Sequence, residues 1–248
     1  MISETFSGED VKISFKGNFK YPSGEEYPTG RIDSFKIIVD GVLTEEATGV
    51  NRKIDKLYDR AIVSDVDDTS AYSFLFARND TLKLSGGNDI VSGFGGKDKI
   101  LGRGGDDTLD GGESSDDIRG GGGNDFITGG TGRDILKGGS GIDTFDFNAV
   151  NESKNKAKKR DVIKDFDKGT DRLDVSDIDA IDGGVDDGFV FIGKSKFSET
   201  AGELRFSFDK VNKKKVTIVE GDVDGDGVGD FEIELSGKIN LPETDFIL

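Results

Sequence analysis

Apolar and polar residues alternate over short stretches in the first part of the chain, for example over residues 11–15 and 35–39. A period of two is typical of β-strands with one buried face. Residues 54–62 instead carry apolar side chains at helical spacing, so a short helix and a strand both remain open there. The pattern as a whole predicts a β-rich segment over residues 1–74.

The middle of the chain, residues 75–146, has a different pattern, in which one apolar residue recurs every nine positions. An aspartate stands two positions before each apolar residue, and this register holds over eight successive units. The aspartates are Asp80, Asp89, Asp98, Asp107, Asp116, Asp125, Asp134 and Asp143, and the apolar residues are Leu82, Val91, Ile100, Leu109, Ile118, Ile127, Leu136 and Phe145. The period predicts a repeat structure, because a flexible Gly/Asp-rich linker has no reason to keep a fixed register.

Each unit is interpreted as a glycine-rich turn followed by a short strand. Two units then form one coil of a flat solenoid, so aspartates eighteen positions apart stack on the same side. Carboxylates and turn carbonyls together supply the oxygen ligands, about six to eight per ion, that Ca²⁺ binds. The stacked pairs predict six Ca²⁺ sites: Asp80 with Asp98, Asp89 with Asp107, Asp98 with Asp116, Asp107 with Asp125, Asp116 with Asp134, and Asp125 with Asp143. The glycines expected to line these sites are Gly86, Gly95, Gly104, Gly112, Gly121, Gly123, Gly130, Gly132, Gly139 and Gly141.

The repeats are expected to fold only when Ca²⁺ is bound. One buried apolar residue contributes about 1.5–3 kcal/mol. Ordering the backbone costs roughly 1–2 kcal/mol for each residue, and most where glycine is frequent. A single anchor in nine residues therefore cannot hold the coil, and the free energy of metal binding has to supply the difference.

The composition excludes several kinds of function. The 50 acidic residues exceed the 33 basic ones, and the formal charge of −17 disfavours nucleic acid and anionic membranes as partners. No stretch is apolar for long enough to insert stably into a membrane. Because Cys and His are absent, thiolate sites, His-Glu-x-x-His zinc sites and Ser-His-Asp triads are excluded. Six divalent ions would bring the charge to roughly −5, which couples folding to neutralisation.

The last part of the chain, residues 147–248, opens with a lysine-rich stretch and then returns to strand-like patterns. Residues 222–230 place oxygens and a glycine as at the start of an EF-hand loop, but Ile233 stands where that loop needs a Glu. A hairpin turn is the favoured interpretation. The basic stretches 154–160 and 213–215 are expected to be solvated loops, with an acidic polysaccharide as the alternative partner.

The repeat resembles the nonapeptide of the RTX family, Gly-Gly-x-Gly-x-Asp-x-apolar-x, which residues 129–137 match at every defined position. Residues 143–147, 161–166, 169–176 and 221–231 resemble the segment that follows the repeats in serralysin-type proteases, related lipases and alginate epimerase modules. The resemblance implies a parallel β-roll that binds Ca²⁺ in a bacterial, extracellular protein. It also implies that residues 245–248, an Asp followed by three apolar residues, are the uncleaved signal for type I secretion machinery. The N-terminus lacks the pattern of a cleavable signal peptide.

The repeat pattern is irregular at its two ends and at one unit in the middle. Family members use an aspartate beyond the last repeat to finish the terminal site, and Asp161 lies eighteen positions after Asp143. Asp161 is therefore either a ligand or a simple strand-edge carboxylate. Ser114 occupies a glycine position and is expected to weaken the neighbouring sites, and the units before Gly87 lack the leading glycine pair.

The expected fold is all-β, with an N-terminal β-rich cap (1–74), a parallel β-roll (75–146) and a β-rich, β-sandwich-like secretion module (147–248). The first functional hypothesis is a secreted, non-enzymatic calcium-binding protein. The second is a calcium-gated adhesin or matrix protein whose N-terminal segment binds an exopolysaccharide. The third is a small polysaccharide-active enzyme, for which the candidate carboxylates are Glu25, Glu26, Glu45 and Glu46.

Overall fold

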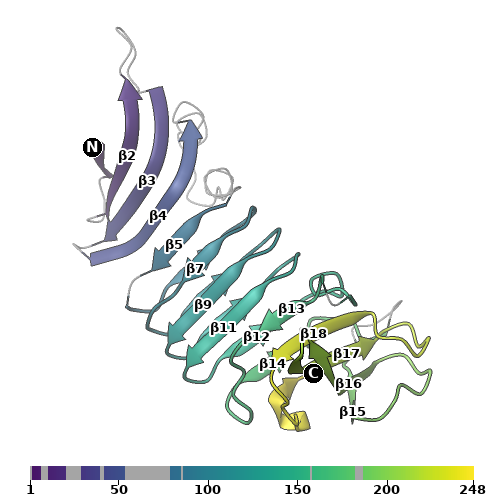
Figure 1. Cartoon of the computed structure of the whole chain (residues 1–248). Coiled ribbons are helices and arrows are strands. Elements are labelled where there is room, and N and C mark those ends of the chain that lie inside the picture. The colour runs from purple at the N-terminus through teal and green to yellow at the C-terminus, as the bar shows by residue number, and fades with distance from the viewer. Residues whose placement is uncertain are drawn as a thin grey trace.

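The computed structural model describes residues 2–6, 11–20, 29–39, 42–53, 79–84, 86–156, 158–181 and 187–248, the first four ranges as strand backbone. Figure 1 shows the strands stacked side by side along one axis, with the N-terminal strands at one end and the C-terminal strands at the other. Among the described residues the regular elements are strands, apart from the 3-10 helix η1 (Glu243–Asp245), so the all-β class is confirmed. The described part contains no helix with the length and apolar character needed to cross a membrane.

Eight strands form the β-roll and alternate between two sheets along the chain. They are β5 (Thr81–Leu84), β6 (Ile90–Ser92), β7 (Lys99–Leu101), β8 (Thr108–Asp110), β9 (Asp117–Gly122), β10 (Phe126–Thr128), β11 (Ile135–Ser140) and β12 (Thr144–Asp146). Each strand pairs in parallel with the next strand of its own sheet, so that Leu82 lies opposite Ile100 and Ile127 opposite Phe145. These partners are eighteen residues apart, which confirms the predicted coil of two units.

The N-terminal strands extend one sheet of the roll. The strands β1 (Ile2–Phe6), β2 (Val11–Lys20), β3 (Thr29–Val39) and β4 (Val42–Lys53) form an antiparallel meander. Strand β4 pairs antiparallel with β5, and this pairing joins the meander to the roll. The strands predicted at residues 11–15 and 35–39 are confirmed, whereas residues 54–62 lie outside the described residues.

The C-terminal strands continue both sheets beyond residue 146. They are β13 (Asp161–Ile163), β14 (Arg172–Asp174), β15 (Val190–Gly193), β16 (Glu203–Val211), β17 (Lys214–Asp222), β18 (Phe231–Ser236) and β19 (Phe246–Ile247). Strand β13 pairs with β11 and β14 pairs with β12, so together they add a further coil to the roll. The order β13-β18-β17-β16-β15 completes a 13-stranded sheet, and β19 pairs with β14 at one end of a 6-stranded sheet. The end of the chain is thus part of the fold.

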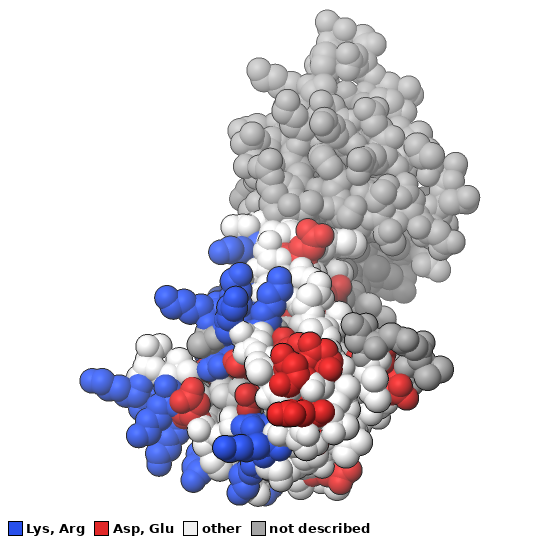
Figure 2. All heavy atoms as spheres, turned by 90° about the vertical axis from the view of Figure 1, so that its right-hand side faces the viewer, with Lys and Arg blue, Asp and Glu red and all other residues white. Residues whose placement is uncertain are grey.

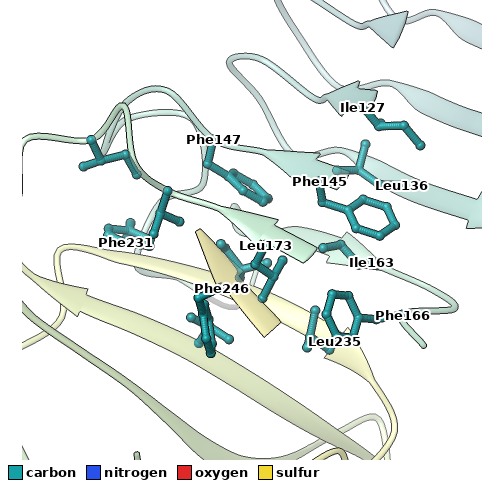
Figure 3. Close-up of a cluster of buried hydrophobic side chains, with 14 of the residues drawn as sticks. Ile127, Leu136, Phe145, Phe147, Ile163, Phe166, Leu173, Phe231, Leu235 and Phe246 are labelled. Carbon is teal, nitrogen blue, oxygen red and sulfur yellow. The ribbon is translucent and has the colours of Figure 1, made fainter. Parts of the chain in front are cut away.

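The core of the roll is a column of apolar anchors between the two sheets. Seven of the eight predicted anchors are at most 3% exposed, and Val91 is half-buried because β6 is an edge strand. Towards the C-terminus the column widens into the cluster of large side chains in Figure 3, where the rings of Phe145 and Phe166 lie 6.1 Å apart. The C-terminal part therefore supplies the larger apolar core that the thin roll lacks.

Candidate calcium sites

The aspartates of the repeats form two columns, one along each edge of the roll, because successive turns lie on opposite edges. The first column contains Asp80, Asp98, Asp116 and Asp134, and the second contains Asp89, Asp107, Asp125 and Asp143. In both columns the main-chain N–H of each of the first three aspartates donates to Oδ1 of the aspartate eighteen residues later, over 2.7–3.0 Å. The predicted stacking of these residues is confirmed.

In five aspartates of the columns and in Asp161, the second carboxylate oxygen is buried and has no hydrogen-bond partner. This holds for Oδ2 of Asp107, Asp116, Asp125, Asp134, Asp143 and Asp161. A buried, unpaired carboxylate oxygen costs several kcal/mol unless a proton or a cation compensates it. Its recurrence at the same atom in successive coils indicates a recurring cation position.

At Asp107 and Asp116 this oxygen faces a main-chain carbonyl of the next coil across a space that only glycine leaves open. A Cβ on Gly102 would lie 2.2 Å from Oδ2 of Asp107 and 2.5 Å from the carbonyl oxygen of Gly120. A Cβ on Gly111 would lie 2.6 Å from both Oδ2 of Asp116 and the carbonyl oxygen of Gly129. Carboxylate and carbonyl oxygens of adjacent coils therefore converge, and an all-oxygen donor set fits Ca²⁺.

The raised pKa values of the aspartates in the columns also indicate cation positions. Burial, together with a smaller effect of neighbouring aspartates in the same column, raises the pKa of Asp107 and of Asp143 to about 6 and the pKa of Asp116 to about 8. Burial also raises the pKa of Asp134 and Asp161, which face each other. Without a cation, these side chains hold protons at a pH where aspartate is normally ionised.

Asp161 and Asp171 extend the two columns by one position each. The N–H of Asp134 donates to Oδ1 of Asp161 over 2.6 Å, and the N–H of Asp143 donates to Oδ1 of Asp171 over 3.1 Å. The eighteen-residue count from Asp143 therefore put Asp161 in the wrong column, because the inserted loop 147–160 lengthens one turn and shifts the register. The sequence reasoning missed Asp171, although Leu173 stands two positions after it, as an anchor does in every repeat.

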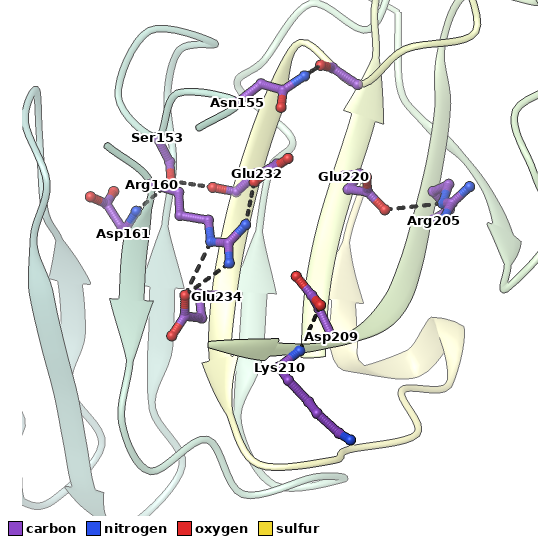
Figure 4. Close-up of polar contacts among 11 residues, drawn as sticks. Ser153, Asn155, Arg160, Asp161, Arg205, Asp209, Lys210, Glu220, Glu232 and Glu234 are labelled. Carbon is purple, nitrogen blue, oxygen red and sulfur yellow. Dashed lines mark hydrogen bonds and ion pairs between the residues drawn. The ribbon is translucent and has the colours of Figure 1, made fainter. Parts of the chain in front are cut away.

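A buried polar network positions Asp161 (Figure 4). Ser153 Oγ accepts the N–H of Asp161 over 2.8 Å and donates to the main-chain oxygen of Glu232 over 2.5 Å. Arg160, only 4% exposed, pairs with Glu232 over 2.5 Å and with Glu234 over 3.1 Å. The prediction of a solvated basic loop is therefore wrong for Arg160, whose partners come from β18, which is distant in sequence.

The predicted turn glycines fall into two groups. Gly112, Gly121, Gly123, Gly130, Gly132, Gly139 and Gly141 lie against the preceding coil, and their φ angles are positive. At Gly139, φ is +115° and a Cβ would lie 2.1 Å from the carbonyl oxygen of Gly121. Ser114 keeps the same left-handed conformation, with φ +83°, despite its side chain. In contrast, Gly86, Gly95 and Gly104 have room for a Cβ, so backbone crowding does not explain them.

The loop between β17 and β18 is a hairpin connection, as the favoured interpretation predicts. Carboxylate oxygens of Asp222, Asp224 and Asp226 lie within 4.8 Å of one another. Asp222, however, accepts the N–H of Gly225 over 2.8 Å and the N–H of Gly227 over 2.9 Å. The Asp222 carboxylate thus holds the turn, and no ion site is assigned to this loop.

The parallel β-roll with an aspartate column on each edge defines an RTX-type calcium-binding fold. A family model described as Peptidase M10 serralysin C terminal matches residues 85–248, about two thirds of the chain, and the chain belongs to this family. The structure of the AlgE6R3 subunit of the Azotobacter vinelandii mannuronan C5-epimerase is similar over 68% of this chain and 77% of that chain, with 23% identity and a TM-score of 0.41. The structure of the AlgE6R2 subunit of the same enzyme is similar over 73% of this chain and 96% of that chain, with 23% identity and a TM-score of 0.37. No curated protein matches the sequence.

Proposed function

We propose that the chain is a non-enzymatic calcium-binding protein that is exported unfolded and folds when its roll binds Ca²⁺ outside the cell. The supporting observation is the set of buried Oδ2 atoms without partners, repeated coil after coil. Membership of the serralysin C-terminal family supports Ca²⁺ as the ion.

The proposed ligands are the Oδ2 atoms of both columns together with the carbonyls of the predicted turn glycines. Each ion lies between two stacked turns, which gives the six predicted sites. Asp161 and Asp171 extend each column, so up to eight ions are accommodated. Filling the six predicted sites adds twelve positive charges to a chain of charge −17, which removes most of the self-repulsion of the folded state.

The export part of the proposal rests on the C-terminal residues. In the folded protein Phe246 is 8% exposed and lies in β19 against β14, and Asp245 is fully buried. A type I secretion machine that recognises residues 245–248 would therefore have to act before the roll folds. Cytosolic Ca²⁺ lies far below the 10⁻⁴–10⁻³ M range in which extracellular calcium modules bind, so the chain stays unfolded until it reaches the extracellular medium.

The proposal of no enzymatic activity rests on residue types. The chain has no His or Cys, which removes the usual general base and nucleophile. Of the four candidate glutamates, Glu25 and Glu26 lie outside the described residues, and Glu45 and Glu46 are described only as backbone of β4. The adhesin hypothesis for residues 1–74 likewise stays a prediction.

Counting the bound ions by calorimetric titration tests the proposal. Asp125→Asn keeps an oxygen to accept the N–H of Asp107 but replaces the free Oδ2 with an amide. We expect this variant to bind at least one Ca²⁺ fewer than the wild type, while Asp209→Asn, a change at an exposed position, binds the same number. Equal stoichiometry for all three proteins would contradict the assignment.

A further inference from the structure

The hairpin of β16 and β17 carries a basic, partly aromatic surface that the calcium columns do not use. Directly opposite residues of an antiparallel pair share a face, so Phe208 lies beside Thr217, and Lys210 lies beside Lys215. Phe206 on the same face is buried, whereas Phe208 is 37% exposed. The apolar face of the sheet therefore runs out of the core and ends in an exposed ring next to lysines.

Two further lysines from other segments are placed over this ring. Lys238 Nζ lies 4.7 Å from the centroid of Phe208, and Lys194 Nζ lies 5.8 Å from it. Lys194 also donates to Asn240 Oδ1 over 3.2 Å, and the N–H of Gly237 donates to the main-chain oxygen of Lys215 over 3.1 Å. The segments that follow β15 and β18 thus bring Lys194 and Lys238 to the face on which the hairpin carries Lys210 and Lys215.

The rings behind Phe208 fix its position. Phe206 packs edge-on against Phe208 with ring centroids 5.7 Å apart, and Phe191 stacks on Phe206 at 6.1 Å. Phe191 in turn lies 4.9 Å from Phe246 of β19. A row of rings therefore connects the exposed ring to the core. Because the Phe208 side chain is already ordered, little side-chain entropy is lost when a ligand binds to it.

The local charge is opposite to that of the chain. Lys194, Lys210, Lys215 and Lys238 are exposed in a protein with a formal charge of −17. Asp209 lies between Phe208 and Lys210 in sequence, but residues in a strand alternate between faces, so its side chain is on the opposite face. Figure 2 shows Lys and Arg side chains projecting along one flank of the described part, beside a face that carries a compact group of carboxylates.

We propose that this surface, formed by Phe208 with Lys194, Lys210, Lys215 and Lys238, binds an acidic polysaccharide. A sugar ring packs its C–H groups on an exposed aromatic ring, and its carboxylate or sulfate group meets the ammonium groups. Nucleic acid fits less well, because successive bases stack on several exposed rings, whereas Phe208 is exposed here and Phe206 behind it is buried. The choice of a glycan also rests on the proposed extracellular location, whereas the surface itself does not.

Binding of a heparin-derived hexasaccharide, a sulfated acidic glycan, to the full chain at saturating Ca²⁺ tests this inference. We expect Phe208→Leu and the double variant Lys194→Gln/Lys238→Gln each to weaken binding about fivefold or more, as for central residues of an interface. Lys158→Gln/Lys159→Gln is the matched control, since it removes the same charge from an exposed loop far from this surface in sequence. The control should bind as the wild type does, and raised salt should weaken binding by all proteins that bind.

Three outcomes would overturn the inference: wild-type affinity in both surface variants, equal weakening in the control, or tighter binding of single-stranded DNA or phosphatidylserine vesicles than of the hexasaccharide. Each variant is first checked for an unchanged Ca²⁺-dependent circular dichroism transition. A failure of the calcium proposal would appear in that check, and a failure of the glycan inference would appear only in the binding data.

Discussion

The raised pKa values of the buried aspartates predict opposite pH dependences with and without Ca²⁺. In the calcium-free folded roll the pKa of Asp116 is raised from 3.8 to about 8 by burial, and the pKa values of Asp107 and Asp143 are raised to about 6. Between the unfolded and folded pKa values the folded chain holds a proton that the unfolded chain has lost, so stability falls as pH rises. For Asp116 alone the loss between pH 5 and pH 7 is about 3 kcal/mol.

With Ca²⁺ the sign reverses, because the ion binds the ionised carboxylate and protons compete with it. The calcium-loaded roll should therefore gain stability from pH 5 to pH 7. The assay for the calcium-free chain is the midpoint of sucrose-induced folding, and for the loaded chain it is the thermal midpoint, both followed by far-ultraviolet circular dichroism.

Asp116→Asn isolates the contribution of one group. It should flatten the calcium-free pH dependence by about 3 kcal/mol between pH 5 and pH 7, whereas Asp209→Asn should leave it unchanged. The reasoning is refuted if the calcium-free chain becomes more stable as pH rises from 5 to 7, or if Asp116→Asn behaves like Asp209→Asn.

Three further predictions concern the backbone and the polar network, each read from the thermal midpoint in Ca²⁺. Gly139→Ala should prevent adjacent coils from packing against each other, because its Cβ would lie 2.1 Å from a backbone oxygen. The control Gly169→Ala is also at positive φ but has open space around it, so it should cost only about 1–2 kcal/mol. Similar losses for the two variants would contradict the crowding argument. Ser114→Gly should raise stability by about 1 kcal/mol, because Ser114 holds a φ of +83°, and a lowered midpoint would count against this. Arg160→Met should lower the free energy of unfolding by about 3–5 kcal/mol, because it leaves the carboxylates of Glu232 and Glu234 unpaired. Adding Glu234→Gln should restore part of this loss. An unchanged thermal midpoint in Arg160→Met would show that the fold does not need the ion pairs of Arg160.

The roll was predictable because its restraints are local and repeated. The period of nine fixes the turn, the inward anchor and the partner eighteen residues away, and the strand registers agree with each of these. The edge position of β6 was not predictable, since the burial of Val91 depends on which strands lie beside it. The general lesson is that a repeat encodes contacts within the stack but not where the stack ends.

The end of the columns was the part that sequence reasoning placed wrongly. An insertion of unknown path separates Asp143 from the next coil, so counting residues across it cannot assign a column. The path depends on Arg160 and Ser153 meeting β18, contacts between residues more than seventy positions apart. The spacing of Asp171 and Leu173 was the one local signal available for the second column.

Circular dichroism of the full chain with and without Ca²⁺ shows directly whether the order of the roll depends on calcium. We expect a largely disordered spectrum in calcium-free buffer at pH 7.5 and a cooperative change to a β spectrum on adding Ca²⁺. EDTA should reverse this change, and the same concentration of Mg²⁺ should not produce it. A β spectrum that is already complete without Ca²⁺ and unchanged by EDTA would contradict it.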